Sequence, residues 1–211
     1  MQIDFSTLSA YQRYKLMASL IVPRPIALVT TRNAAGVVNA APFSMFNMLG
    51  EDPPILMISI NKLHDHHLKD TAANILANRQ FVVHIADEPM AEQMHRCGDT
   101  LPAGTSELDV VGLTTAPSRA VLPPYIVEAP VAFECELSEL LETTSRHIFI
   151  GRVLWLHARE DLIDTERYRV RLQNYFPVAR FGASYYIRTR DRFSMDPEKA
   201  GVESNPIDEL S

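Results

Sequence analysis

The chain has 211 residues, of which 46% are hydrophobic and 22% are charged, and its formal net charge is −6. This is the composition of a globular protein, and the length suits one domain with a substantial core. The acidic balance argues against sequence-independent binding of nucleic acid, which needs a basic surface. A small anionic ligand stays possible, because it needs only a local positive pocket.

The cysteines and the apolar runs bear on the compartment. Cys97 and Cys135 lie far apart and show no C-x-x-C spacing, so a reduced, cytoplasmic environment is the simpler expectation. Residues 1–5 lack a basic stretch followed by an apolar run, and we expect no signal peptide. The longest apolar runs, such as residues 55–60, are too short to cross a bilayer, so we expect no membrane segment.

The first expected element is a helix over residues 6–21, with Ser6 or Ser9 as its N-cap. Its apolar residues roughly follow a period of 3.6 residues: Leu8, Tyr11, Met17 and Leu20. Pro23 and Pro25 then force the chain into an extended path.

A β-hairpin is expected next. Residues 26–31 form a short apolar, β-branched run, residues 33–36 (Asn-Ala-Ala-Gly) form a turn, and Val37 and Val38 begin the return strand. Residues 40–49 are apolar but interrupted by proline, and no regular element is assigned to them. Residues 55–60 predict a second buried strand.

Two helices and a strand follow. A helix is expected over residues 70–78 with Asp70 as its N-cap, because its apolar residues share one face. Residues 81–85 predict a strand, and residues 89–97 predict a helix that stops at a glycine. The small and polar residues of 99–106 indicate a loop.

The second half of the chain is mostly strand. Residues 131–137 alternate between apolar and other side chains, the period of a half-buried strand. Residues 148–156 form a long strand with Gly151 inside it, which marks a bend or a close approach to the backbone. We expect one α+β domain over residues 1–190, built on a barrel, and a polar C-terminal tail over residues 191–211.

Two segments are candidate ligand sites. Lys69, Asp70 and Thr71 stand at a predicted helix N-terminus, whose free N–H groups and partial positive charge suit a phosphate. The alternative is an ordinary capped helix with a solvated lysine. The strand of residues 24–32, together with residues 39–44, offers small residues and a proline against which a planar ligand can lie. A tight strand crossing inside a barrel explains that pattern equally well.

The histidines provide weaker candidates. His64, Asp65, His66 and His67 invite a metal interpretation, but neighbouring residues rarely converge on one ion, and a polar loop is the preferred interpretation. His147 begins the long strand and either contacts a substrate or is simply a polar residue at a strand end. The sequence contains neither a G-x-S-x-G nucleophile motif nor a G-x-G-x-x-G dinucleotide motif.

The order of several short motifs carries a resemblance. The chain contains V-P-R-P-I-A-L-V-T-T, N-A-A-P-F-S-M-F-N, P-P-I-L-M-I-S-I, K-D-T-A-A-N-I, F-V-V-H-I, S-E-L-D-V-V-G-L-T, E-A-P-V-A-F-E-C-E-L and H-I-F-I-G-R-V. Each is weak alone, but their order over about residues 10–190 resembles the flavin reductase-like, FMN-binding split-barrel family, and within it the flavoredoxin-type branch. The resemblance implies a mainly β, α+β split barrel with a few peripheral helices, which dimerises and holds FMN at the dimer interface.

The resemblance also implies roles for residues, matched by position. The isoalloxazine edge would lie along Pro42, Phe43 and Ser44, with Thr30 and Thr31 beside the ring or ribityl chain. The ribityl chain and phosphate would lie near Ser59 and Asn61, and the phosphate end near Lys69, Asp70 and Thr71. His147 would lie on the nicotinamide side, and Phe181 would help to close the ring pocket. No metal ligand is implied.

The charge of the flavin phosphate needs local compensation in an acidic protein. The resemblance makes Arg24, Arg32, Lys62 and Lys69 candidates for that compensation. The chain departs from the family pattern at residues 62–67, where a histidine-containing insertion precedes K-D-T and can alter the phosphate pocket.

The implied activity is that of an NAD(P)H-dependent flavin reductase, in which hydride passes from the nicotinamide C4 to flavin N5. The alternatives are an FMN electron carrier without NAD(P)H oxidation, an FMN-dependent reductase of another acceptor such as a ferric chelate, a metal-binding protein using the histidine cluster, and a pyridoxamine-phosphate oxidase-like enzyme. The choice between NADH and NADPH, the electron acceptor or partner oxygenase, and whether FMN is a prosthetic group or a released product stay open at this point.

Overall fold

The computed structural model describes residues 1–63, 67–102, 104–193 and 195. His64, Asp65 and His66, and all but four residues of the expected tail over 191–211, lie outside the described residues. None of the described helices is long and apolar enough to cross a membrane.

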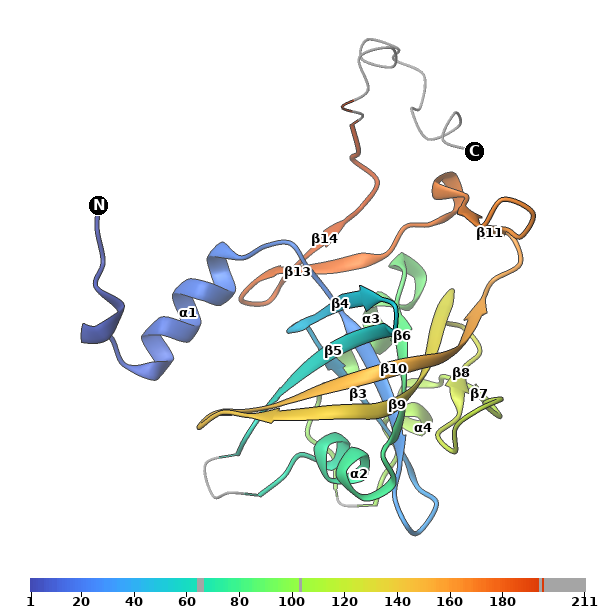
Figure 1. Ribbon diagram of the computed structural model, residues 1–211, viewed down its shortest axis with the longest axis horizontal. Helices are drawn as coiled ribbons and strands as arrows, with labels where there is room; N and C mark the ends of the chain where they lie inside the picture. The colour runs from blue at the N-terminus through green and yellow to red at the C-terminus, as the bar shows by residue number, and fades with distance from the viewer. Residues whose placement is uncertain (64–66, 103, 194, 196–211) are drawn as a thin grey trace.

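Seven antiparallel strands form the main sheet (Figure 1). In spatial order they are β3 (Val38–Phe43), β2 (Ala27–Arg32), β6 (Gln80–Ile85), β9 (Val131–Glu142), β10 (Arg146–Ala158), β5 (Pro54–Asn61) and β4 (Phe46–Glu51). The expected hairpin and the strands in the second half are confirmed. Residues 40–49, which the sequence left unassigned, supply most of β3 and β4.

The remaining elements are small. A second sheet holds β1 (Arg24–Pro25), β13 (Val178–Gly182) and β14 (Tyr185–Arg188), and two further pairs are β7 (Thr115–Ala116) with β8 (Tyr125–Ile126) and β11 (Ile163–Asp164) with β12 (Arg169–Val170). The α-helices are α1 (Ala10–Leu20), α2 (Asp70–Asn78), α3 (Ala91–Arg96) and α4 (Glu107–Val111), and 3₁₀ turns cover Phe5–Thr7, Glu88–Met90 and Leu172–Asn174.

The main sheet curls into a barrel because its two edge strands are consecutive in the chain. Only Ser44 and Met45 separate the end of β3 from the start of β4. The N–H of Ser59 in β5 donates to the carbonyl of Met45 at 2.8 Å, which fixes this link against the far side of the sheet. The two edges therefore meet at this link, and no pairing between β3 and β4 is seen in the described residues. The fold is the mainly β split barrel with a few peripheral helices that the sequence led us to expect.

Alternation along the strands separates an inner core from an outer one. Val29 of β2 points inward, whereas its neighbour Leu28 points outward toward α3 and α4. The inner core holds the largest fully buried side chains of the barrel, and α2 closes one end of it with Ala72 and Ile75. The strands contribute side chains to this inner core that include Ile58, Phe81, Leu137 and Phe149.

The long strand β10 passes close to a core aromatic ring at its glycine. A Cβ added to Gly151 would overlap the Phe81 ring and would lie 3.2 Å from the Cβ of Cys135. The sequence predicted that another group lies close to the backbone at Gly151, and the structure shows that this group is the Phe81 ring.

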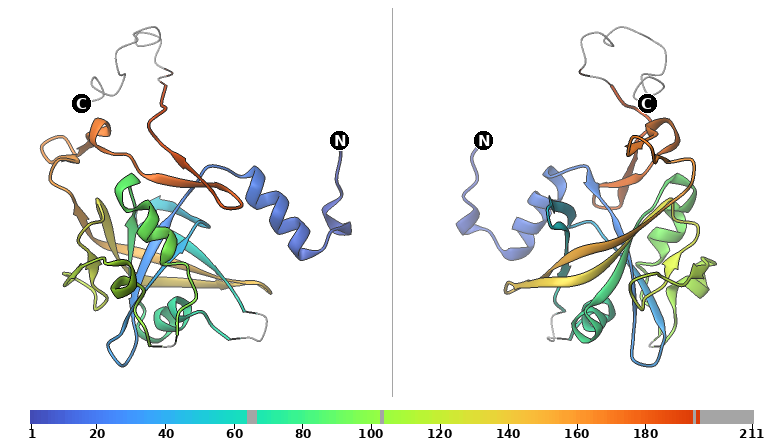
Figure 2. Two further views of the ribbon diagram at one scale, coloured as in Figure 1. Left: turned by 180° about the vertical axis from the view of Figure 1, so that it is seen from behind. Right: turned by 45° about the vertical axis from the view of Figure 1, so that its right-hand side comes forward.

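The first helix differs from the sequence expectation in its start and its burial. It begins at Ala10, because Ser9 caps it in a reciprocal pair with Gln12, and residues 5–7 form a separate 3₁₀ turn. Its expected apolar face is not buried: Tyr11 is 68% exposed and Leu20 75% exposed. Figures 1 and 2 show α1 standing away from the barrel, with the β13–β14 hairpin beside it.

Two further expectations are corrected. The residue at the N-cap position of α2 is Lys69, and Asp70 is the first residue inside the helix. The strand β9 is not half-exposed over residues 131–137: Ala132 and Glu134 are as buried as Cys135, because residues 118–126 cover its outer face.

The fit of Phe81 against Gly151 gives a stability prediction. Gly151→Ala should lower the free energy of unfolding by about 1–3 kcal/mol, the usual cost of overpacking a core, as measured by urea unfolding. Gly182→Ala is the matched control, because a Cβ there would meet nothing closer than 3.7 Å. Equal losses of stability in the two variants would contradict the account.

Candidate functional site

The N-terminus of α2 carries free donors. No side chain caps this helix, and its first backbone hydrogen bond runs from Ala73 N–H to the Lys69 carbonyl, so the preceding N–H groups are available to an anion. The Thr71 hydroxyl accepts from Asn39 Nδ2 at 2.9 Å, which leaves its proton free to donate. Asp70 contributes only its backbone, since its carboxylate would repel an anion.

Arg146 provides a second cation beside this helix end. Burial and the nearby positive charge of Arg146 together lower the pKa of the Lys69 ammonium. Neither cation forms an ion pair with a carboxylate in the described part of the chain. Two like charges held together without a counterion favour the binding of an anion.

Ser59 and Asn61 lie against Arg146 as the strand register dictates. Asn61 is paired with Arg146 across β5 and β10, and Arg146 Nη1 donates to the Ser59 carbonyl at 3.3 Å. The structure thus brings together Lys69, Thr71, Ser59 and Asn61 from the expected set. Arg146 was missed in the sequence, because its role depends on the register opposite Asn61.

The other expected cations are engaged elsewhere. Arg32 Nε donates to the Gly36 carbonyl within the hairpin turn, at 3.2 Å. Lys62 forms an ion pair with Glu142 at 2.9 Å, and this ion pair lowers the pKa of the Glu142 carboxyl. His147 Nε2 lies 3.7 Å from the same carboxylate, so His147 is placed next to an ion pair and is almost fully buried.

A cavity of about 400 Å³ borders residues 42–44, the segment along which the edge of the isoalloxazine ring was expected. Pro42 and Ser44 line it, and Arg24 Nε donates to the Ser44 hydroxyl at 3.4 Å. Phe43, by contrast, points into the inner core. Phe181 is 48% exposed and does not line this cavity, whereas its neighbour Arg180 does.

Thr30 and Thr31 point to opposite faces of β2. Thr31 accepts from Asn74 Nδ2 of α2 at 3.0 Å. Thr30 donates to the Pro124 carbonyl at 2.7 Å, on the face covered by residues 118–126. Only Thr31 therefore shares a face with the α2 site.

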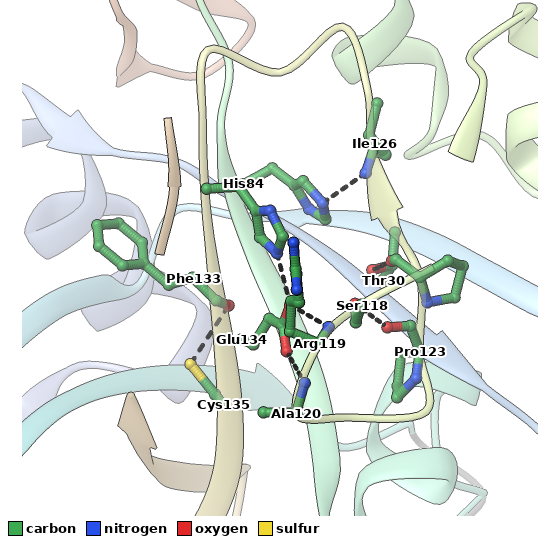
Figure 3. A network of polar contacts seen from close by, with 12 residues as sticks. Thr30, His84, Ser118, Arg119, Ala120, Pro123, Ile126, Phe133, Glu134 and Cys135 are labelled. Carbon is green, nitrogen blue, oxygen red and sulfur yellow. Dashed lines mark hydrogen bonds and ion pairs between the residues drawn. The ribbon is translucent and has the colours of Figure 1, made fainter. Parts of the chain in front are cut away.

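A buried polar network holds residues 118–126 against the barrel (Figure 3). The carboxylate of Glu134 is fully buried and accepts hydrogen bonds from the backbone N–H groups of Arg119 and Ala120, at 2.7 and 2.6 Å. It also lies 2.5 Å from His157 Nε2. Burial alone would raise the pKa of Glu134, but these three bonds lower it.

His84 belongs to the same network in one defined tautomer. The Ile126 N–H donates to its Nε2 at 2.9 Å, so Nδ1 carries the proton and donates to the Leu28 carbonyl at 2.9 Å. Burial lowers the pKa of His84 to about 4. This histidine is neutral and structural.

No metal centre is seen in the described residues, which contain no group of three or more possible ligands. The proposed metal cluster includes His64 and His66, which lie outside those residues.

The fold is that of a split-barrel protein, and the N-terminus of α2 is its candidate anion site. The model of the flavin reductase-like domain matches residues 17–196. The chain belongs to this flavin reductase-like family.

Solved structures of known proteins are similar over nearly the whole chain. The 2-nitrobenzoate 2-nitroreductase of Pseudomonas fluorescens is 40% identical with a TM-score of 0.84, over 92% of this chain and 95% of that one. Nitrilotriacetate monooxygenase component B of Bacillus cereus is 30% identical with a TM-score of 0.86, over 92% and 98%. The flavoredoxin of Desulfovibrio vulgaris shares the fold at 19% identity, with a TM-score of 0.74 over 93% and 97%.

The low pKa of His84 predicts acid sensitivity. In the unfolded chain this histidine takes up a proton near pH 6.5, whereas in the fold it does so only near pH 4. Stability is therefore lost as the pH falls between these values, by about 2 kcal/mol from about pH 7.5 to about pH 5. Urea unfolding across this range should show the slope, and His84→Gln should remove that share of it.

The control for this prediction is His95→Gln, which removes an exposed histidine. If His84→Gln and His95→Gln change the pH slope equally, the assignment of the slope to His84 is wrong.

Proposed function

We propose that this protein binds FMN and acts as an NAD(P)H-dependent flavin oxidoreductase. The observation that carries the proposal is the pair of cations Lys69 and Arg146, which form no ion pair among the described residues and lie beside the uncapped N-terminus of α2 in a flavin reductase-like chain. A phosphate monoester matches these donors in charge and in hydrogen-bonding capacity.

Different residues of the chain would bind different parts of FMN. Lys69, Arg146 and the Thr71 hydroxyl would hold the phosphate, and the Ser59 hydroxyl would contact the ribityl chain or phosphate. Backbone groups of residues 42–44 would bond the polar edge of the ring. Two of these donors are held in place by a second bond, Arg146 by the Ser59 carbonyl and Thr71 by Asn39.

Bound FMN would supply the redox chemistry by accepting hydride at N5 from the nicotinamide C4. For this step the protein has to orient the two rings and exclude water, and no protein acid or nucleophile is required. We assign no proton transfer to His147, and its proposed place on the nicotinamide side rests on the family resemblance. The burial of its ring beside Glu142 supports a positioning role there.

We also propose that two copies of the chain form a homodimer with FMN at their interface. The exposed apolar side chains of α1, including Tyr11, Met17 and Leu20, support this, because monomers rarely leave so many on one element. The likeness to component B of a monooxygenase supports delivery of electrons to a partner oxygenase as one use of the reduced flavin.

The experiment is an absorbance titration of the purified protein with FMN, followed by addition of NADH and then NADPH. We expect a bound-flavin spectrum that bleaches at catalytic rates with one of the two nucleotides. Lys69→Ala and Arg146→Gln should each weaken FMN binding about tenfold, the loss of one charge-assisted hydrogen bond.

Lys62→Ala is the matched control, because it removes the same charge from the same region but one already paired with Glu142. It should change the FMN affinity much less. Bound flavin that neither nucleotide reduces would favour an electron carrier, and a protein that binds no flavin would contradict the proposal.

A further inference from the structure

We propose that the cavity between α1 and the β13–β14 hairpin is a binding site for a planar aromatic carboxylate. An electron acceptor of this class would also carry a reducible ring substituent, which takes the two electrons of the reduced flavin and protons from solvent while the carboxylate stays unchanged. The role as an acceptor rests on the proposed function, but the binding site stands on its own geometry.

The cavity gathers positive charge without acidic partners. Lys15, Arg24 and Arg180 all line it, and none of them forms an ion pair within the part of the chain that the structure describes. Burial, together with the charge of Arg180, lowers the pKa of the Arg24 guanidinium. In a protein of net charge −6, three uncompensated cations around one cavity favour an anionic ligand.

The two guanidinium groups are held in fixed positions. Arg24 is only 8% exposed, and its Nη1 donates to the carbonyls of Ala18 and Ile21. Arg180 Nη1 donates to the Tyr186 hydroxyl at 2.7 Å. Because these hydrogen bonds orient both guanidinium groups before a ligand arrives, little side-chain entropy is lost when a carboxylate binds.

The remaining walls suit an aromatic ring. Tyr11, Tyr14 and Tyr186 line the cavity, and the buried side chains of Ile26 and Met94 complete it. Aromatic and thioether groups make favourable contacts with a ring, whereas a phosphate would gain nothing from them. A volume of about 400 Å³ is at the lower end of the range for small-molecule sites, which suits a single ring rather than a dinucleotide.

The cavity also lies where an acceptor would need to be. Pro42 and Ser44 form part of its wall, and these residues belong to the segment at which the flavin ring edge is proposed. A ring bound between this wall and the tyrosines would lie next to the flavin, as electron or hydride transfer requires.

The test is calorimetric titration of the FMN-loaded protein with benzoate, benzamide and acetate as probes. We expect benzoate to bind about tenfold more tightly than the neutral amide or the ring-free acid, because each lacks one of the two recognised features. Arg180→Gln should weaken benzoate binding about tenfold, and Lys15→Gln, which is exposed, about threefold.

Arg13→Gln is the matched control, since it removes one positive charge from the same helix but from a residue that does not line the cavity. Equal effects of Lys15→Gln and Arg13→Gln, or equal binding of benzoate and benzamide, would overturn the proposal. Displacement of FMN by benzoate would overturn it too, because the cavity would then hold the flavin ring itself. Equal competition by inorganic phosphate would indicate a general anion site and would also contradict it.

The experiment distinguishes failure of the proposed function from failure of the carboxylate site. The flavin spectrum is recorded before any acid is added, and a protein that binds no FMN is titrated with benzoate in its flavin-free form. Binding there, with the same dependence on Arg180 and Lys15, would support the carboxylate site alone.

Discussion

The arrangement of the whole molecule depends on the two-residue link between the edge strands β3 and β4. Because Ser44 and Met45 alone connect strands at opposite ends of the sheet order, the sheet must curl until its edges meet there. The bond from Ser59 to Met45 then ties β5 to this point. The same link places Ser44 in the wall of the cavity and, through the bond to Met45, fixes Ser59 beside Arg146, so the closure of the barrel positions residues of both candidate sites.

Two cationic clusters in an acidic chain follow from this geometry. Lys69 and Arg146 lie at the α2 end, and Arg24 and Arg180 lie at the cavity, with Tyr14 touching both clusters. Its ring lies 5.8 Å from the Arg146 guanidinium and also lines the cavity. A helix that buries little of its own apolar surface therefore contributes to both clusters. These contacts hold α1 beside the barrel, although most of its apolar side chains are exposed.

The sequence predicted the strands well and the site only in part. Runs such as residues 55–60 and 81–85 become barrel strands because burial on the inner face enforces their apolar pattern. Only the start of β3, at Val38, was expected, and β4 was not recognised, because proline and glycine obscured strands that lie at the sheet edges. Thr30 looked equivalent to Thr31 but points to the opposite face, and Arg146 and Arg180 gained their roles only through strand register. Such pairings are long-range, and no local motif encodes them.

The most direct test of the account is a crystal structure of the protein with FMN bound. The account predicts the flavin phosphate within hydrogen-bonding distance of Lys69 and Arg146 at the start of α2, the ring edge along residues 42–44, and α1 packed on a second copy. A phosphate held away from α2, with Lys69 and Arg146 still facing solvent, would contradict the assignment of the site.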